Sequence, residues 1–238
     1  MLERAKEIIN DISKQTDEII LFHSLSGKDS ITLLELCYPR FRRIVCVYMY
    51  LIPNLEHIKP YYAWAKKKYP NTEWLQVPHY GWYSYKKTGY MGMEADPKQR
   101  KWTLSDIIDK VRERTGIQWC CLGFKQSDSL NRRLMLRSYK DGKESISWKG
   151  CKFYPLSTYN NKAIRNYIIK ENLKTPETYG SSVGQSCGAS VTDYFYLKYL
   201  SEKYPNDLQK VYDTFPATRI IIENYETERN NDNQAESD

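Results

Sequence analysis

Residues 19–34 read IILFHSLSGKDSITLL and join an apolar strand to an apolar helix through a short Ser/Gly loop. A strand that leads directly into a helix predicts the first crossover of an α/β fold with parallel strands. Gly27 lets the loop backbone turn sharply and approach a ligand, and the N-terminus of the following helix favours an anion. Lys28 adds a positive charge, so the loop is suited to bind a phosphate, although a Ser/Gly turn without a ligand is the alternative interpretation. The candidate binding residues of the loop are Ser24, Ser26, Gly27, Lys28, Asp29 and Ser30.

The segments around the loop repeat this alternation of strand and helix. Arg43–Leu51 is a near-continuous apolar run, which is typical of a central parallel strand covered on both faces. The pattern predicts an α/β fold: a doubly wound, mostly parallel sheet with helices on both faces and a ligand site beyond the carboxyl ends of the strands. The expected strands are 18–23, 43–51, 73–77 and 118–122. The expected helices are 1–15, 29–38, 55–69 (begun or kinked at Pro60), 103–114 (capped near Thr103 and Asp106), one within 153–173, and 191–203.

With 238 residues, the chain is long enough for one large domain with a helical appendage. We expect a phosphate-binding α/β domain over 1–180, with an aromatic and basic insert at 78–101. A C-terminal helical extension is expected over 181–225 and a disordered acidic tail over 226–238. No stretch approaches the roughly 18–20 apolar residues that cross a bilayer, and the mixed-charge N-terminus is not typical of a signal peptide. We therefore expect no membrane partner and a cytoplasmic location.

The net charge is +7, and the tail 226–238 holds five acidic residues against one arginine, so residues 1–225 carry +11. A basic surface suits polyanionic ligands, either nucleotides or nucleic acid. Residues 80–101 interleave aromatic and basic side chains, as a platform for single-stranded nucleic acid does. Protein-interface and lid interpretations fit the same residues, because tyrosine and tryptophan favour all of these surfaces.

Cysteine and histidine give little sign of a metal site. Six cysteines occur without a C-x-x-C pair, and most of them lie in apolar segments. This usage predicts reduced, buried thiols in a reducing compartment. The histidines His23, His57 and His79 share no metal-ligand spacing, so no zinc site is expected. His23 adjoins the Ser/Gly loop, and it either lines the same pocket or is an ordinary histidine at a strand end.

Two later blocks carry the remaining signals. Gly123–Arg132 reads GFKQSDSLNR and follows an expected strand. Lys125 and Arg132 would lie at the carboxyl end of that strand, where cations bind phosphate or sulfate oxygens, and Asp128 between them can orient an arginine. Lys152–Ile168 reads KFYPLSTYNNKAIRNYI, whose proline turn and apolar positions predict a helix that docks on the sheet.

Together the three blocks resemble the phosphoadenosine phosphosulfate (PAPS) reductase family of the PP-loop, or N-type ATP pyrophosphatase, superfamily. The loop is similar to the family's S-G-G-K-D-S, with Ser26 in place of the first glycine or with one glycine lost. The third block resembles F-x-P-L-x-x-W-x-x-x-D-[IV]-x-x-Y-I without its aspartate. The resemblance spans residues 19–180 and implies an adenine nucleotide alpha hydrolase-like fold. The residues at the five positions of the family's G-x-R-x-x-E-S-x-x-R are Gly123, Lys125, Asp128, Ser129 and Arg132, with Lys for Arg and Asp for Glu.

The resemblance also implies a function. Such a protein binds ATP (or PAPS) with Mg²⁺ and cleaves the α–β bond of ATP by adenylyl transfer. The loop residues and Gly123 would bind the nucleotide, and Val47 and Tyr48 would border the adenine. The family includes the small subunit of ATP sulfurylase, which works beside a GTPase, so a partner subunit is a further expectation. The catalytic residues implied are Lys28, Asp29, Lys125 and Arg132.

The C-terminal part departs from the family. PAPS reductases end with an E-C-G-x-H motif whose thiol attacks sulfur, whereas Cys187 is followed by glycine but lacks the flanking Glu and His. Two alternatives to adenylyl transfer therefore stay open. One is a non-catalytic, nucleotide-sensing accessory protein associated with DNA, and the other is a thiol-dependent PAPS or adenylylsulfate reductase that uses Cys187. Cys120 and Cys121 resemble the double cysteine of iron–sulfur adenylylsulfate reductases, but the downstream C-x-x-C of those enzymes is missing.

Overall fold

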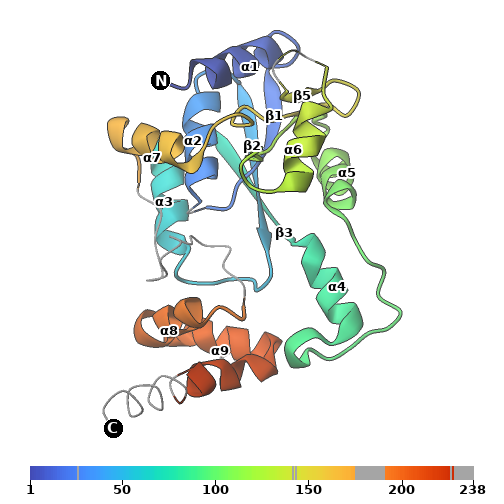
Figure 1. Cartoon of the computed structure of the whole chain (residues 1–238), viewed down its shortest axis with the longest axis vertical. Coiled ribbons are helices and arrows are strands. Elements are labelled where there is room, and N and C mark those ends of the chain that lie inside the picture. The colour runs from blue at the N-terminus through green and yellow to red at the C-terminus, as the bar shows by residue number, and fades with distance from the viewer. Residues whose placement is uncertain (26, 141, 143, 175–190, 226, 228–238) are drawn as a thin grey trace.

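The structure, a computed structural model, describes the chain except for residues 26, 141, 143, 175–190, 226 and 228–238. The described residues form a six-stranded sheet in the order β3-β2-β1-β4-β6-β5 (Figure 1). Neighbouring strands are parallel except for β5, which pairs antiparallel with β6. This sheet confirms the predicted α/β fold. The strands are β1 (Glu18–Phe22), β2 (Arg43–Tyr50), β3 (Thr72–Pro78), β4 (Cys120–Cys121), β5 (Ile146–Ser147) and β6 (Lys152–Phe153).

Helices cover both faces of the sheet, as predicted. Side chains alternate along each strand between two apolar cores, so that Ile19 and Leu21 of β1 pack on one side and Ile20 and Phe22 on the other. Helices α1, α2, α3 and α7 contribute to the first core, whereas α5 and α6 contribute to the second. The helices are α1 (Glu3–Ser13), α2 (Lys28–Cys37), α3 (Lys59–Lys68), α4 (Tyr80–Thr88), α5 (Leu104–Thr115), α6 (Leu130–Arg137), α7 (Asn161–Lys170), α8 (Tyr194–Lys203) and α9 (Pro205–Thr214), with short 3₁₀ turns η1 (Tyr90–Gly92) and η2 (Pro216–Thr218).

The helical connections pass from one face of the sheet to the other beside the central strand β1. Helices α2 and α3 connect β1 to β2 and β2 to β3 over the first core. After β3 the chain returns through α5, over the second core, to β4 on the other side of β1. The carboxyl ends of β1 and β4 therefore meet at a topological switch point, which is where open α/β sheets bind their ligands.

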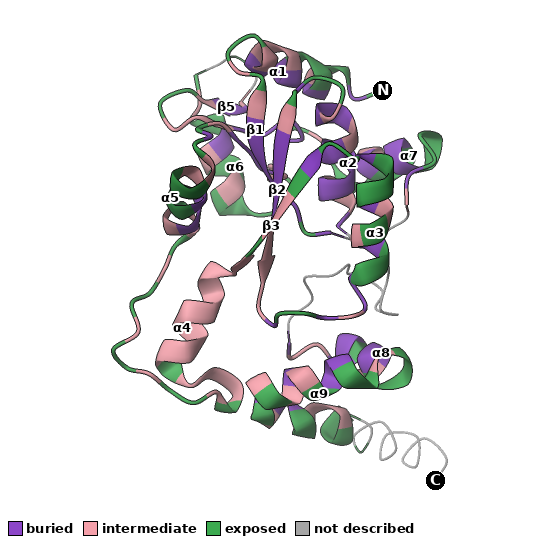
Figure 2. Cartoon of the chain, turned by 180° about the vertical axis from the view of Figure 1, so that it is seen from behind, coloured by how far each residue is buried: buried purple, intermediate pink, exposed green. Residues whose placement is uncertain are grey.

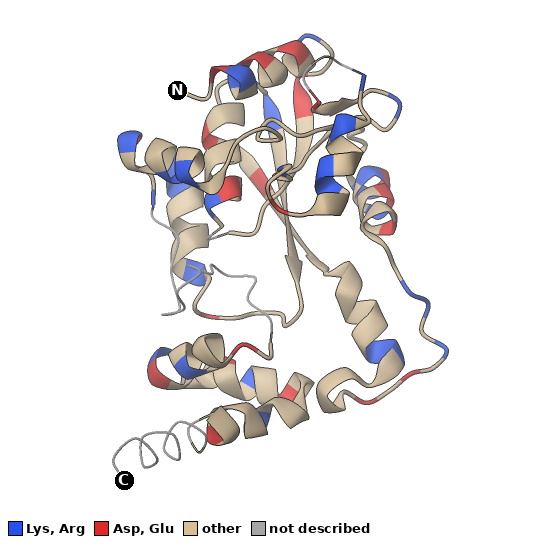
Figure 3. Cartoon of the chain, in the orientation of Figure 1, with Lys and Arg blue, Asp and Glu red and all other residues tan. Residues whose placement is uncertain are grey.

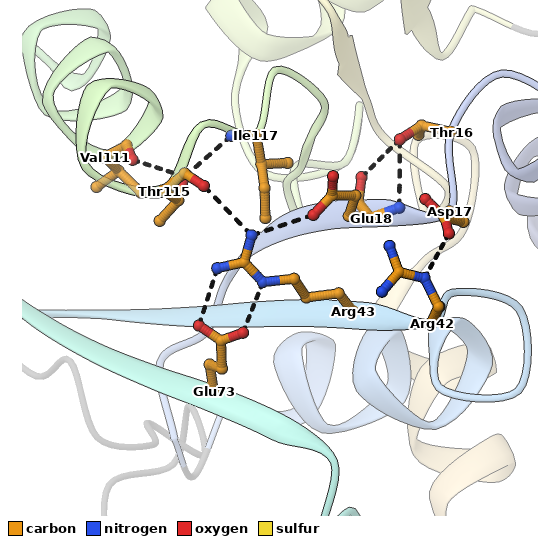
Figure 4. Close-up of polar contacts among 9 residues, drawn as sticks. All are labelled: Thr16, Asp17, Glu18, Arg42, Arg43, Glu73, Val111, Thr115 and Ile117. Carbon is orange, nitrogen blue, oxygen red and sulfur yellow. Dashed lines mark hydrogen bonds and ion pairs between the residues drawn. The ribbon is translucent and has the colours of Figure 1, made fainter.

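A charged cluster fixes the opposite, amino-terminal edge of the sheet (Figure 4). The guanidinium of Arg43 on β2 donates to both carboxylate oxygens of Glu73 on β3, at 2.6 and 3.1 Å, and to Glu18 on β1 at 3.1 Å. It also donates to the carbonyl of Thr115 at the end of α5. The hydrogen bond and charge of Arg43 hold the pKa of Glu73 below its usual range. This cluster ties three strands in register, far from the carboxyl ends.

The residues at the starts of three helices explain where those helices begin. Thr103 and Asp106 form a capping box at α5, as expected from the sequence. Helix α3 begins beside Pro60, one of the two predicted alternatives. Helix α8 begins at Tyr194 rather than at residue 191, because the carboxylate of Asp193 accepts the backbone N–H of Tyr196 and caps the helix there.

The predicted insert at 78–101 contains a helix that the apolar pattern did not indicate. Helix α4 has no buried residue (Figure 2), so it lacks the one-sided apolar stripe from which amphipathic helices are inferred. It extends beyond the carboxyl end of β3, at the same end of the molecule as α8 and α9 (Figure 1). Tyr85 and Tyr90 stack with ring centroids 4.4 Å apart, and both pack edge-on against Phe215 after α9. The insert is therefore held between the sheet and the C-terminal helices.

Asp207 attaches the C-terminal helices to the loop before α3. Its side chain is fully buried, and its carboxylate accepts the backbone N–H groups of Glu56 and His57 at 2.7–2.9 Å. The ring of His57 lies 3.0 Å from the same carboxylate, and Lys210 pairs with it at 3.1 Å. Burial alone would raise the pKa of Asp207, but these hydrogen bonds outweigh it and lower the pKa below its usual value.

Because the pKa of Asp207 is lowered, we expect the free energy of unfolding to decrease at acid pH. A carboxyl group whose pKa is lower in the folded state stabilises the fold above its unfolded pKa, and this contribution is lost as the pH falls through the folded value. We expect the free energy of unfolding of the wild type to fall below about pH 4, and less steeply in Asp207→Asn. Asp207→Asn should also lower the free energy of unfolding by about 1–3 kcal/mol at pH 7. Urea titrations across this pH range measure both effects. Asp213→Asn, an exposed change on the same helix, should leave the curve unchanged.

Within the described residues, no helix combines the length and apolar character that crossing a bilayer requires. The division of the chain at residue 180 and the cytoplasmic location stay predictions. Apart from Thr227, the expected acidic tail lies outside the described residues.

Candidate functional site

A cleft of about 620 Å³ opens at the carboxyl ends of the central strands, within the range of small-molecule sites. Its floor comes from the ends of β1, β2 and β4 and the first turn of α2, and its outer wall comes from α4 and the start of α8. The structure thus brings together candidate residues from three distant segments of the chain, 24–30, 47–48 and 123–132. The candidates from the sequence that line the cleft are Ser24, Asp29, Ser30, Val47, Tyr48, Gly123, Asp128 and Arg132.

The Ser/Gly loop is closed by contacts between its own hydroxyl groups. The hydroxyl of Ser30, in the first turn of α2, accepts the backbone N–H of Ser24 at 3.0 Å and lies 3.0 Å from the Ser24 hydroxyl. Gly27 has an extended backbone with φ −73°, so its role is not a left-handed turn. A Cβ at this position would lie 2.1 Å from Ser24 Oγ, so a larger residue fits only if the Ser24 hydroxyl rotates. Ser26, which the sequence places in this loop, lies outside the described residues.

The backbone turn itself is made by Leu25. This buried residue has φ 56°, in the left-handed region that leucine rarely adopts. Its backbone N–H donates to Nδ1 of His23 at 2.9 Å, and that bond holds the turn. Strained residues of this kind gather at ligand sites, where the surrounding structure pays for them.

Lys125 is the centre of a buried ionic network beneath the loop. Its side chain is 1% exposed, and its ammonium lies 2.8 Å from Asp29 Oδ2 and 3.0 Å from Asp128 Oδ1. Asp29 Oδ2 also pairs with Lys28 at 2.9 Å. Asp29 and Lys125 are 96 residues apart in the chain, and Gly123 allows them to meet, because a Cβ there would lie 3.2 Å from that of Asp29. The network therefore fixes the first turn of α2 against the end of β4.

Arg132 is held in place at the edge of the cleft. Its guanidinium donates to Asp128 Oδ2 at 2.8 Å and lies over the ring of Phe124, 4.1 Å from the centroid. Burial would raise the pKa of Asp128, but the hydrogen bond and charge of Lys125, with the bond from Arg132, lower it below its usual value. Asp128 is therefore ionised at neutral pH. Arg132 stays 41% exposed, so its remaining donors can reach a ligand.

Asp29 retains one carboxylate oxygen for a further partner. Oδ1 is buried, and no described residue lies within hydrogen-bonding distance of it. Asp29 lines the cleft, and Mg²⁺ prefers carboxylate and phosphate oxygens, so this carboxylate would hold a magnesium ion beside the phosphates of a ligand once its side chain rotates to expose Oδ1. The described residues contain no group of three or more His, Cys, Asp or Glu side chains that could hold a metal by themselves.

The aromatic side chains of the insert mostly contact one another. Tyr83 stacks on Trp102 with centroids 4.7 Å apart, and Tyr85 stacks on Tyr90. Rings paired in this way do not form an open row for successive bases. Lys and Arg residues are spread over several helices, among them α5, α6 and α7, and over the segment between α4 and α5 (Figure 3). Binding of nucleic acid through 80–101 stays a prediction that these contacts do not favour.

The outer wall of the cleft was not indicated by any motif. It contains His79, Tyr80 and Tyr85 from the insert and Tyr196 of α8, and Phe124 after β4 also lines the cleft. The rings of His79 and Tyr80 lie 4.1 Å apart, and His79 Nδ1 accepts the backbone N–H of Gly81 to cap α4. Only the aromatic richness of the insert pointed to a role for this segment.

Four of the five cysteines in the described part of the chain are buried thiols, and Cys151 is partly exposed. Cys37, Cys46 and Cys121 lie in the first core with no exposed surface, and Cys120 lies in the second. Burial raises the pKa of Cys46 and Cys121 above the usual range and that of Cys120 to about 11. Cys187 lies outside the described residues, so its proposed role as a thiol stays a prediction.

This burial predicts thiols that resist alkylation. With iodoacetamide at pH 8, peptides that contain Cys46 or Cys121 should stay unmodified in the native protein and react at once in 6 M guanidinium chloride, because a buried thiol forms almost no thiolate. Mass spectrometry of tryptic peptides measures the reaction. Cys151, which is partly exposed, serves as the internal comparison and should react in the native state. Rapid native alkylation of Cys121 would contradict the buried arrangement.

Comparisons with known proteins do not identify a function for the chain. No protein-family model matches the chain. None of the curated proteins matches it either. Among solved structures, the chain is similar to the U34-tRNA thiolase NcsA from Methanococcus maripaludis with its [4Fe-4S] cluster, with 14% identity and a TM-score of 0.49 over 93% of this chain and 78% of that one. It is also similar to NH₃-dependent NAD synthetase from Campylobacter jejuni, with 12% identity and a TM-score of 0.45 over 92% of this chain and 94% of that one. Both TM-scores are below 0.5, and neither likeness assigns an activity to this chain.

Proposed function

We propose that the chain is a PP-loop nucleotide-binding protein whose cleft binds ATP with Mg²⁺. The observation that carries the proposal is the network that joins Lys28 and Asp29 of the loop to Lys125 and Asp128 after β4. It holds a helix N-terminus and a Gly/Ser loop open toward a cleft at the switch point of the sheet. These features favour a polyphosphate, and the matches to the family motifs favour an adenine nucleotide.

Each group of residues has a distinct role in this proposal. The backbone N–H groups of the loop and the first turn of α2 bind the β- and γ-phosphates, and the ammonium of Lys28, which is 22% exposed, adds charge beside them. Arg132, at the edge of the cleft, offers its guanidinium as a fork for phosphate oxygens. Val47 and Tyr48 border the adenine from the end of β2. Mg²⁺, when bound by Asp29 Oδ1 and the phosphates, would neutralise charge on the triphosphate.

The reaction that fits these roles is adenylyl transfer. A nucleophilic oxygen of an acceptor forms a bond to the α-phosphorus, the bond from that phosphorus to the bridging α–β oxygen breaks, and pyrophosphate leaves with the electron pair. Lys28 and Arg132 stabilise the negative charge that develops on the leaving pyrophosphate. Lys125 acts as a positioning residue in this scheme, because both neighbouring carboxylates occupy its ammonium.

Isothermal titration with ATP and Mg²⁺, followed by an assay for pyrophosphate with sulfate or a nucleic-acid acceptor, tests the proposal. We expect ATP to bind the wild type and Arg132→Gln to weaken its binding at least tenfold, because a charge-assisted hydrogen bond is lost. Arg133→Gln is the matched control, since Arg133 bonds the backbone of Gln126 and does not line the cleft. Absence of ATP binding by the wild type would refute the proposal.

A nucleotide-sensing accessory protein is the second candidate. The observation that favours it is the burial of Lys125, which leaves one cation of the family's second motif paired with carboxylates. Such a protein would bind ATP tightly and release no pyrophosphate with any acceptor. A thiol-dependent PAPS or adenylylsulfate reductase is a third reading that depends on Cys187. Loss of sulfite release from PAPS in Cys187→Ser would support it, and unchanged release would exclude it.

A further inference from the structure

The imidazole of His23 forms part of the cleft wall directly after β1. Its side chain is 2% exposed, and its ring meets the ring of Trp74 edge-on with centroids 5.1 Å apart. The backbone N–H of His23 continues the sheet by donating to the carbonyl of Val47 at 2.8 Å. The ring therefore lies on the side of β1 that faces β2 and β3, away from the contact between Asp29 and Gly123.

The hydrogen bonding of the ring assigns its tautomer. Nδ1 accepts the backbone N–H of Leu25, so the proton of the neutral ring is on Nε2. Burial lowers the pKa of His23 to about 3, which keeps the ring neutral at physiological pH. Nε2 is buried, and no described residue accepts its hydrogen. Buried N–H groups are nearly always paired, because an unpaired one costs free energy, so this donor calls for an explanation.

The position and charge of the donor indicate which part of a nucleotide it fits. The charged groups, Lys28 and Arg132, lie with the helix N-terminus, where phosphates would bind. His23 offers a single neutral donor beside Tyr48, the residue expected to border the adenine. A neutral donor matches a neutral acceptor, such as a ring nitrogen of the base or an oxygen of the ribose.

We propose that the Nε2–H group of His23 donates a hydrogen bond to the nucleoside part of the bound nucleotide. This inference rests on the proposed function of the cleft. The strained turn at Leu25 holds the ring in the required orientation through Nδ1. Because Nε2 exposes almost no surface, the nucleoside reaches it when a neighbouring side chain of the wall rotates aside. Free energy that the unpaired donor costs the folded chain is then recovered on binding.

Two substitutions separate this role from a structural one. The side-chain oxygen of His23→Asn takes the place of Nδ1 and can still accept the Leu25 N–H, but nothing remains at the position of Nε2. His23→Gln places an amide nitrogen near Nε2 and keeps a donor there. We expect His23→Asn to bind ATP at least tenfold more weakly, and its melting temperature to fall somewhat, because the smaller side chain leaves a void and unpaired amide N–H groups. His23→Gln should recover part of the ATP affinity.

Titrations with ATP and with inorganic tripolyphosphate, each with Mg²⁺, complete the test. A contact to the nucleoside predicts that His23→Asn weakens ATP binding and leaves tripolyphosphate binding unchanged. Equal losses for both ligands or an unchanged ATP affinity would each overturn the inference. Failure of the proposed function would look different, because wild-type protein would then not bind ATP at all.

Discussion

Lys125→Met should lower the free energy of unfolding by about 3 kcal/mol, the largest effect that we expect from a single change near the cleft. The ammonium of Lys125 is buried between Asp29 and Asp128, and methionine would leave two carboxylates facing each other without their shared cation. Asp29 would keep Lys28 and Asp128 would keep Arg132, so the protein should still fold. Urea unfolding followed by circular dichroism measures the change.

The same variant should lose ATP affinity at least tenfold, because the first turn of α2 is no longer fixed against β4. Lys110→Met is the matched control. Lys110 also forms an ion pair, at 2.6 Å from Glu113, but its side chain is 63% exposed, so its removal should change the stability by less than about 1 kcal/mol. Equal effects of the two substitutions would contradict the assignment of Lys125 as the buried centre of the network.

Gly27→Ala is expected to weaken ATP binding at least tenfold and to lower the free energy of unfolding by about 1–2 kcal/mol. The new methyl group would lie 2.1 Å from the hydroxyl of Ser24. That hydroxyl would have to rotate away from Ser30, which would open the loop where phosphate is expected to bind. Titration with ATP and thermal melting measure the two effects.

A double-mutant cycle identifies the cause of this effect. In a Ser24→Ala background the hydroxyl is absent, and the methyl group of Gly27→Ala meets the Cβ of residue 24 at an ordinary 3.4 Å. The second substitution should then cost less than about 0.5 kcal/mol, so the two changes are strongly coupled. Additive effects would show that Gly27 is needed for another reason, such as close approach of the ligand to its backbone.

The sequence predicted β1 to β4 because these strands are apolar and separated by helices, whereas β5 and β6 were missed because two residues are too few to form an apolar pattern. Residues 43–51 carry a near-continuous apolar run, and the structure places 43–50 of them in β2, beside the central strand β1. Helix α4 was missed because its tyrosines pack partly on several sides and leave no single buried face. The contact between η1 and η2 that supports it joins distant segments and leaves no local signal.

The sequence motifs named residues that the structure brings together around one cleft, but they did not show how the side chains are arranged. Local motifs placed Asp29, Lys125 and Arg132 at strand ends, where a ligand site was expected. They could not show that Lys125 is enclosed by carboxylates, since its partner Asp29 lies 96 residues earlier in the chain. The sequence also could not show what restricts position 27. A side chain there would meet the hydroxyl oxygen of Ser24, whereas the sequence suggested a backbone turn.

A crystal structure of the chain with α,β-methylene-ATP and Mg²⁺ tests the nucleotide-binding cleft most directly. We expect the triphosphate over Gly27 and the first turn of α2, Arg132 within hydrogen-bonding distance of a phosphate oxygen, and the adenine beside Tyr48. A nucleotide bound instead in the separate apolar groove of about 410 Å³ between β3 and α5 would contradict this assignment. So would an empty cleft at a nucleotide concentration that saturates the protein in solution.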